Sequence, residues 1–243
     1  MCRLFAADYD GLVSTTTSAR KRLTARRTTV ALKMAMAVTG VLFVLFLLAH
    51  MYGNFKVLSG QEAFDGYAEH LRELGEPLLP YAGFLWILRI ALLVSLVVHV
   101  AATVILWRRA SRARGTRYTM KKAVGSTLSS RTMRWGGLAL LAFIIFHILQ
   151  FTTLTIEVGG SFDSPYDRMI AAFSQWYILL IYAVAMVALG MHLRHGIWSA
   201  VQTLGWSSGK RQLTIKRVAL VVAVVVVVGF LAPAFVIFFG IID

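Results

Sequence analysis

Four of the six histidines lie inside long apolar stretches of the chain, one in each of four stretches: His50, His99, His147 and His192. A polar side chain at membrane depth is costly, and such residues usually have a function. A neutral histidine hydrogen-bonded between helices would explain one of them, but it explains four in four stretches poorly. Because imidazole nitrogen is a good ligand for haem iron and for zinc, these four residues are the candidate metal ligands.

Five apolar stretches must position these side chains, and each is close to the ~20 residues that a helix needs to cross a bilayer. They cover about residues 30–52, 84–107, 135–156, 173–200 and 218–242. With 58% hydrophobic and 15% charged residues, the chain is more apolar than a soluble domain. The valine-rich last stretch is expected to be a helix, since a lone strand in lipid would leave its backbone unpaired. The sequence predicts an all-α bundle of five transmembrane helices over 29–243, preceded by an arm over 1–28.

Basic residues concentrate in alternate segments. Residues 1–33, 108–134 and 201–217 hold seven, nine and four Lys or Arg, whereas 53–83 holds two against five acids and 157–173 holds one against three. The positive-inside rule therefore places the N-terminus in the cytoplasm and, after five crossings, the C-terminus outside. The same pattern makes the net charge of +14 a sign of topology rather than of nucleic-acid binding.

Depth in the membrane decides which histidines can share a metal. At a rise of ~1.5 Å per residue, His50 and His147 lie about 24 and 18 Å from the inner edge, and the other two lie about 23–24 Å from the outer edge. His50 and His147 thus form an outer layer, and His99 and His192 form an inner layer roughly 15 Å away. Two histidines at one height suit a b-type haem. Zinc usually takes three or four clustered ligands, so the isolated pairs favour two haem b groups.

Two further residues are candidates near the haems. His195 follows His192 by three residues, so either one could face the metal. The position of His195 beside Arg194, one turn nearer the cytoplasm, favours His192 as the ligand and His195 as a contact to a haem propionate or water. Arg89, in the second stretch, could bind an outer propionate or extend to the membrane interface, and both interpretations stay open.

The outer end also holds groups that could serve a quinone, whose carbonyl needs a hydrogen-bond donor and whose reduction needs a proton source. These candidates are Tyr52, Glu69, Arg72, Glu73 and Gln150. Residues 61–75 have the spacing of a short interfacial helix, and Glu69 and Glu73 also fit its solvated face. His70, in the same segment, is expected to be solvated or near a quinone.

With these histidines, the chain resembles the membrane-anchor cytochrome b of succinate dehydrogenases and fumarate reductases, in its five-helix, single-chain, di-haem type. The resemblance covers nearly everything after residue 28 and rests on the four histidines and on segment 192–206. In relatives a glycine and later a Gly-Trp or Trp-Gly pair follow the fourth ligand. Gly196, Gly205 and Trp206 match that pattern when His192 is the ligand. The family pairs its first histidine with the third and its second with the fourth.

The resemblance implies an electron-transfer subunit that does not itself oxidise succinate. A flavoprotein with FAD and an iron–sulfur protein would dock on the cytoplasmic face of a bacterial plasma membrane and supply electrons from the tricarboxylic acid cycle. This chain would carry the electrons through two haems to menaquinone. Some fumarate reductase relatives use a glutamate before the second span for quinol oxidation. Arg72 falls there in this sequence, between Glu69 and Glu73.

The same membrane histidines are also consistent with two other functions. A di-haem cytochrome b anchor of a hydrogenase or formate dehydrogenase would have similar haem spectra, and the co-purifying soluble subunits would distinguish it. A transporter that uses membrane histidines for protons or metal would bind no haem, and its substrate uptake would depend on those histidines.

Overall fold

The computed structural model describes residues 4–113 and 128–242, with side chains described over 28–113 and 133–242. All regular elements in these residues are helical. The α-helices are α1 (Leu4–Phe55), α2 (Gln61–Glu73), α3 (Gly83–Arg112), α4 (Leu128–Phe151), α5 (Pro165–Phe173), α6 (Trp176–Thr203) and α7 (Gln212–Phe238), with short 3-10 turns at Lys56–Ser59 and Gly209–Arg211. Five segments of the described chain are long and apolar enough to cross a membrane: Thr28–Ser59, Gly83–Arg112, Met133–Phe151, Trp176–Thr203 and Gly209–Phe238. The predicted all-α bundle with five spans is confirmed.

Several predicted span ends were wrong by a few residues. The third span stops at Phe151 rather than near 156, and the backbone then turns through Leu154, whose φ is 55°. The fourth begins at Trp176 rather than 173, because an extended Gln175 separates it from α5. The fifth ends at Phe238 rather than 242. Apolar loop residues beside these ends make the sequence look helical beyond the point where the helix stops.

Helices outside the apolar spans agree with the sequence prediction in part. The short helix expected over 61–75 is present as α2. Helix α1 continues back to Leu4 without a break at residue 28, the predicted end of the N-terminal arm. Helix α5 was not predicted, although its start has a local signal. Ser164 accepts a hydrogen bond from the Asp167 backbone N–H at 3.2 Å, and Pro165 occupies the first turn.

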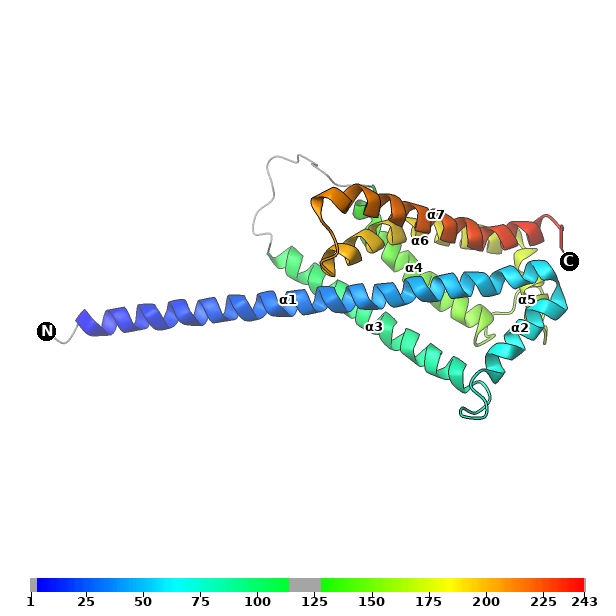
Figure 1. Ribbon diagram of the computed structural model, residues 1–243, viewed down its shortest axis with the longest axis horizontal. Helices are drawn as coiled ribbons and strands as arrows, with labels where there is room; N and C mark the ends of the chain where they lie inside the picture. The colour runs from blue at the N-terminus through cyan, green and yellow to red at the C-terminus, as the bar shows by residue number, and fades with distance from the viewer. Residues whose placement is uncertain (1–3, 114–127, 243) are drawn as a thin grey trace.

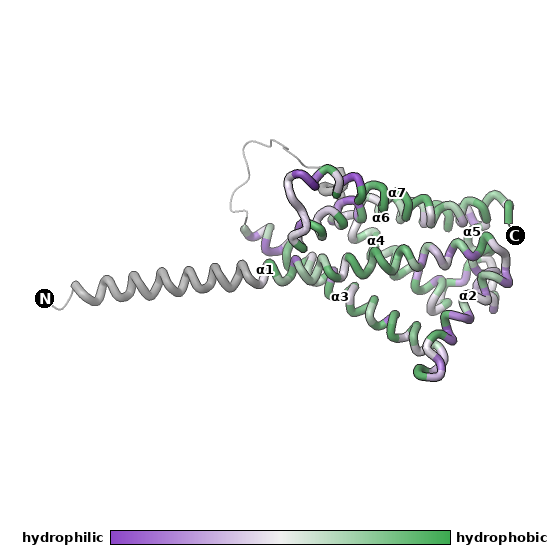
Figure 2. The backbone as a smooth tube through the Cα atoms, in the orientation of Figure 1, coloured by the Kyte–Doolittle hydropathy of each residue, from purple (hydrophilic) through white to green (hydrophobic). Residues whose placement is uncertain are grey.

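The helices place acidic and basic segments of the sequence at opposite ends of the bundle, and Figure 1 shows where these segments lie. Helices α2 and α5 lie at one end, which we call the acidic end, and the C-terminal end of α3 and the start of α7 lie at the other, the basic end. At the basic end Arg109 donates hydrogen bonds to the hydroxyls of Thr28 and Thr29, at 3.1 and 2.9 Å. Between the ends the chain is predominantly hydrophobic (Figure 2). Separation of the charges agrees with the predicted topology, and the direction of insertion stays a prediction.

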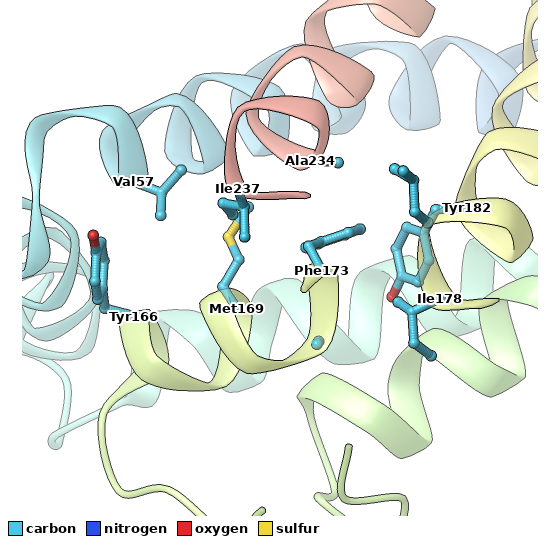
Figure 3. Close-up of a cluster of buried hydrophobic side chains, with 10 residues drawn as sticks. Val57, Tyr166, Met169, Phe173, Ile178, Tyr182, Ala234 and Ile237 are labelled. Carbon is cyan, nitrogen blue, oxygen red and sulfur yellow. The ribbon is translucent and has the colours of Figure 1, made fainter. Parts of the chain in front are cut away.

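Helix α6 is the central element of the bundle, packing against α7, α4 and α1. Helix α3 packs mainly on α1, with α2 at its start. At the acidic end, α5, α6, α7 and the turn after α1 enclose a buried apolar cluster (Figure 3). Val57 is fully buried and Ile178 is 2% exposed in this cluster. Since lipid is as apolar as these side chains, close packing rather than exclusion from water must hold the spans together here.

Helices α2 and α5 are joined by a carboxylate, although about a hundred residues separate them. One carboxylate oxygen of Asp65 accepts from the Ser164 hydroxyl at 2.6 Å, and the other accepts from the backbone N–H of Tyr166 at 3.0 Å. Asp65 thus adds a second cap to the start of α5. A negative charge there is also favoured by the helix dipole.

We expect Asp65→Ala to destabilise the acidic end by about 1–2 kcal/mol, the usual cost of losing a helix cap. The measurement is the thermal unfolding transition of the purified protein in detergent. Glu73→Ala is the matched control, because Glu73 is an exposed carboxylate on the same helix α2. Equal unfolding temperatures in the two variants would contradict a role for Asp65 in joining the helices.

Candidate functional site

The structure brings the four membrane histidines together as two pairs. The ring centroids of His50 on α1 and His147 on α4 lie 5.8 Å apart, with their planes at 82°. Those of His99 on α3 and His192 on α6 lie 6.3 Å apart, at 51°. Each pair joins two different helices, and the first histidine meets the third as the second meets the fourth.

These separations fit one metal ion between each pair. A metal–imidazole bond is about 2 Å long and the ring centre lies about 1.2 Å beyond the nitrogen, so two rings on opposite sides of one ion have centroids about 6.4 Å apart. In the described residues no group of three or more His, Cys, Asp or Glu could hold a metal. Two protein ligands per ion suit haem, whose macrocycle supplies the other four nitrogens, better than they suit zinc.

The distance between the two histidine pairs can be measured along helices α4 and α6, because each helix contacts both pairs. On α4, a side chain at Gly137 would lie 3.8 Å from the His192 ring, and His147 comes ten residues later. On α6, Tyr182 contacts His147 at 2.9 Å, and His192 comes ten residues later. Ten residues of helix rise about 15 Å. Both helices therefore give a separation close to the one expected from depth alone.

A hydroxyl fixes the orientation of one histidine in the pair nearer the basic end. The Thr39 hydroxyl donates to the carbonyl of Ala35 at 2.8 Å, so its oxygen is free to accept. It lies 3.0 Å from Nδ1 of His99. His99 thus donates through Nδ1–H, which leaves Nε2 with its lone pair for a metal.

The other pair has an analogous contact on His147. The Tyr182 hydroxyl donates to Oε1 of Gln150 at 3.0 Å and lies 2.9 Å from Nδ1 of His147. With its one proton engaged, Tyr182 accepts from His147 Nδ1–H, and Nε2 is again left with a lone pair. Tyr182 lies in the buried cluster of Figure 3, its ring 4.9 Å from that of Phe173.

Aromatic side chains and glycines surround the two histidine pairs. Rings of Phe46 and Phe230 lie 5.3 and 5.8 Å from that of His50, centroid to centroid. A side chain at Gly40 would lie 3.7 Å from the ring of His99. Gly40 and Gly137 thus bring backbone without a side chain beside the two rings of that pair.

The two other haem candidates contact tryptophan side chains. His195 contacts Trp198, with ring centroids 5.9 Å apart, whereas His192 is the ring that meets His99. Arg89 is exposed and lies over the Trp86 ring at 5.2 Å, as expected of a side chain extending to the interface. Propionate contacts for either residue stay predictions.

The quinone candidates divide into two groups. Gln150 is 4% exposed and is linked to His147 through Tyr182. The remaining candidates, Tyr52, Glu69, Arg72 and Glu73, are on the surface at the acidic end. Tyr52 is 58% exposed despite lying two residues from His50.

Glu69 belongs to a small surface network. It accepts hydrogen bonds from the Tyr81 hydroxyl and from Arg72, both at 2.8 Å. The hydrogen bond from Tyr81 is the main cause that holds the pKa of the Glu69 carboxyl below its usual range, and the bond from Arg72 adds to it. The Tyr81–Glu69 bond also raises the pKa of Tyr81. A carboxyl with a lowered pKa is ionised at neutral pH, which makes Glu69 a poor source of protons for a quinone.

A pocket at the acidic end adjoins Gln150. Its lining includes Phe151, Glu157 and Arg168 as well as Gln150. The amide Nε2 of Gln150 is buried and has no hydrogen-bond partner within the described part of the chain. A buried donor beside a pocket is a group that a bound carbonyl or water would satisfy.

Sequence reasoning missed Thr39, Gly40 and Tyr182. A threonine and a tyrosine inside apolar stretches are the same kind of signal as the histidines, since each brings a hydroxyl to membrane depth. Only the rotation of α1 and α6 about their axes shows that these hydroxyls face the imidazoles.

The family of the chain follows from comparison with known proteins. Residues 108–232, just over half of the chain, match the family model described as succinate dehydrogenase/fumarate reductase transmembrane subunit. The match contains His147 and His192, one member of each pair. No curated protein and no solved structure matches the chain. With five apolar spans and this match, the chain is a multi-pass membrane protein that belongs to the succinate dehydrogenase/fumarate reductase transmembrane subunit family.

Proposed function

We propose that this subunit is a di-haem cytochrome b, the anchor of a bacterial plasma-membrane succinate:quinone oxidoreductase. It carries electrons between a flavoprotein and iron–sulfur pair on the cytoplasmic face and menaquinone in the membrane. The observation that carries the proposal is the pair of histidine contacts, with ring separations of 5.8 and 6.3 Å in two layers. Membership of the family supports association with the other subunits of such a complex.

The residues of this chain would act as follows. His50 and His147 would hold one haem, and His99 and His192 the other. Each haem iron supplies one-electron transfer when bound. Phenylalanine rings around His50 exclude water. At the basic end, exposed arginines on α3 offer a positive surface for an acidic partner.

The proposal places menaquinone at the acidic end, in the pocket beside Gln150. Gln150, Arg168 and Glu157 line the pocket, and a shift of the Gln150 side chain would bring its buried, unpartnered Nε2 to a quinone carbonyl. Gln150 is preferred to Glu69 because it is linked to His147, whereas Glu69 is engaged with Tyr81 and Arg72 at the surface.

The test is a dithionite-reduced minus oxidised spectrum of the purified complex, with the co-purifying subunits identified by mass spectrometry. We expect b-type bands with about two haems per chain, together with a flavoprotein and an iron–sulfur protein of succinate dehydrogenase type. Absence of haem would refute the proposal and favour a histidine-dependent transporter. Haem with hydrogenase or formate dehydrogenase subunits would refute the assignment to succinate.

Adding bulk at Gly137 should exclude the haem nearer the basic end. A Cβ there lies 3.8 Å from the His192 ring, so the further carbons of a Gly137→Leu side chain would occupy the space beside the imidazole. We expect about half of the haem absorbance to be lost. The control is Gly136→Leu, because a Cβ at Gly136 meets nothing within 4 Å. Full haem content in Gly137→Leu would contradict this placement of the macrocycle.

A further inference from the structure

At the basic end, an exposed arginine near the start of α7 shares a helix face with exposed apolar side chains. Arg217 lies at helical spacing from four exposed apolar residues of α7: Leu213, Leu220, Val224 and Val228. Hydrophilic residues of the turn before α7 give way to hydrophobic residues along the helix (Figure 2). Because acyl chains of lipid cover an exposed apolar face of a membrane span, Arg217 lies where that cover meets the lipid headgroups.

A second cation, Lys216, is held beside Arg217 by a tryptophan of the neighbouring helix. The Lys216 ammonium lies over the Trp198 ring of α6, 5.5 Å from its centroid. The Trp198 indole N–H donates to Oε1 of Gln212 at 3.2 Å, so α7 also holds the indole in place. Residues 168–242 contain no Asp or Glu, and within the part of the chain that the structure describes neither Lys216 nor Arg217 forms an ion pair. Both cations are therefore available to an anion from outside the chain.

The position of the two cations favours a lipid over a soluble acidic protein. The positive-inside rule accounts for basic residues in the turn, where Lys210 and Arg211 already lie, but it does not require a lysine ordered against an indole inside the helix. A soluble partner covers the end of a bundle, whereas the apolar face of α7 continues directly from Arg217 toward the middle of the span. A phospholipid has both parts that this surface needs, because its phosphate accepts hydrogen bonds from ammonium and guanidinium and its acyl chains are apolar.

We propose that Lys216 and Arg217, with Trp198 beneath the lysine, bind the phosphate of an anionic phospholipid whose acyl chains lie along the exposed face of α7. The lipid is anionic rather than zwitterionic, because a headgroup with its own ammonium would be repelled by two cations that have no acid nearby. A basic residue at the surface of an anionic membrane strengthens binding by about fivefold. This site does not depend on haem or on quinone.

The experiment is native mass spectrometry of the purified protein, with its co-purifying subunits, in detergent that contains dioleoylphosphatidylglycerol or dioleoylphosphatidylcholine. The wild type should retain phosphatidylglycerol in preference to phosphatidylcholine. Lys216→Gln and Arg217→Gln should each weaken that retention by about fivefold, whereas Lys216→Arg should preserve it, because the charge and the contact with the indole remain. Lys210→Gln is the matched control, since it removes the same charge from an exposed residue in the turn before α7.

Each other outcome would overturn the proposal. Equal losses in Lys210→Gln and Lys216→Gln would show that the lipid responds to diffuse charge and not to a site on α7. Equal retention of the two lipids by the wild type would show that the surface does not select an anionic headgroup. Displacement of phosphatidylglycerol by inorganic phosphate at equal concentration would show that the acyl chains contribute nothing. Loss of the co-purifying subunits in Arg217→Gln, with lipid retention unchanged, would assign the surface to an acidic protein instead.

Discussion

Replacing His99 or His192 with alanine is expected to remove one haem, the one nearer the basic end, and to leave the other in place. In the proposed site each of these histidines would supply one of two protein ligands, and their rings lie 6.3 Å apart, centroid to centroid. With one of its two protein ligands replaced by alanine, a haem at this pair would be held weakly. The two variants should therefore look alike, each losing about half of the absorbance of the b-type bands.

The control for this prediction is His195→Ala. His195 lies one turn from His192 on the same helix, but its ring contacts Trp198. Haem content should stay at the wild-type level in this variant, although the potential of the nearby haem can change if a propionate contact is lost. Loss of haem in His195→Ala with retention in His192→Ala would show that the two histidines had been assigned in the wrong order.

Replacing His50 or His147 with alanine should remove the other haem and, with it, electron delivery to menaquinone. These rings lie 5.8 Å apart at the acidic end, and His147 is the residue linked to Gln150. Succinate oxidation with a soluble dye, which is the reaction of the partner subunits, should persist. Quinone reduction should fall by at least about tenfold. Measuring both activities on the same preparation separates a lost electron path from a misassembled complex.

His70→Ala is the control for this second prediction, because His70 is an exposed histidine on α2 at the same end of the bundle. It should retain both haems and both activities. The pairing itself is tested by comparing the four alanine variants. If His50→Ala and His99→Ala removed the same spectral component, the histidines would not be paired as the structure has them.

Much of the fold is encoded in features that act locally. The length of each apolar stretch determines that it can span, and the lipid requires it to be helical. The depth of a histidine follows from its place in a span and the rise of a helix. Depth was enough to predict which histidines meet, because alternate spans run in opposite directions. Errors in the span ends of a few residues shift the predicted depths by a few ångströms, less than the separation of the layers.

The contacts around the histidines could not be predicted in this way. They depend on how each helix is rotated about its own axis, and spans that are apolar on all sides carry little information about rotation. Thr39 faces His99 and Tyr182 faces His147 only because α1, α3, α4 and α6 pack in particular orientations. For the same reason, the sequence offered five quinone candidates, and the structure connects one of them, Gln150, to a paired histidine through Tyr182.

The sequence by itself determined a five-span helical bundle with histidines in two layers, because hydrophobic length, charge and helix rise are properties of single segments. Tertiary structure decided which hydroxyls hold the imidazoles, which glycines leave room beside them, and where a pocket opens. Those are properties of surfaces that come together from different helices, and close packing fixes them only when all the helices are in place.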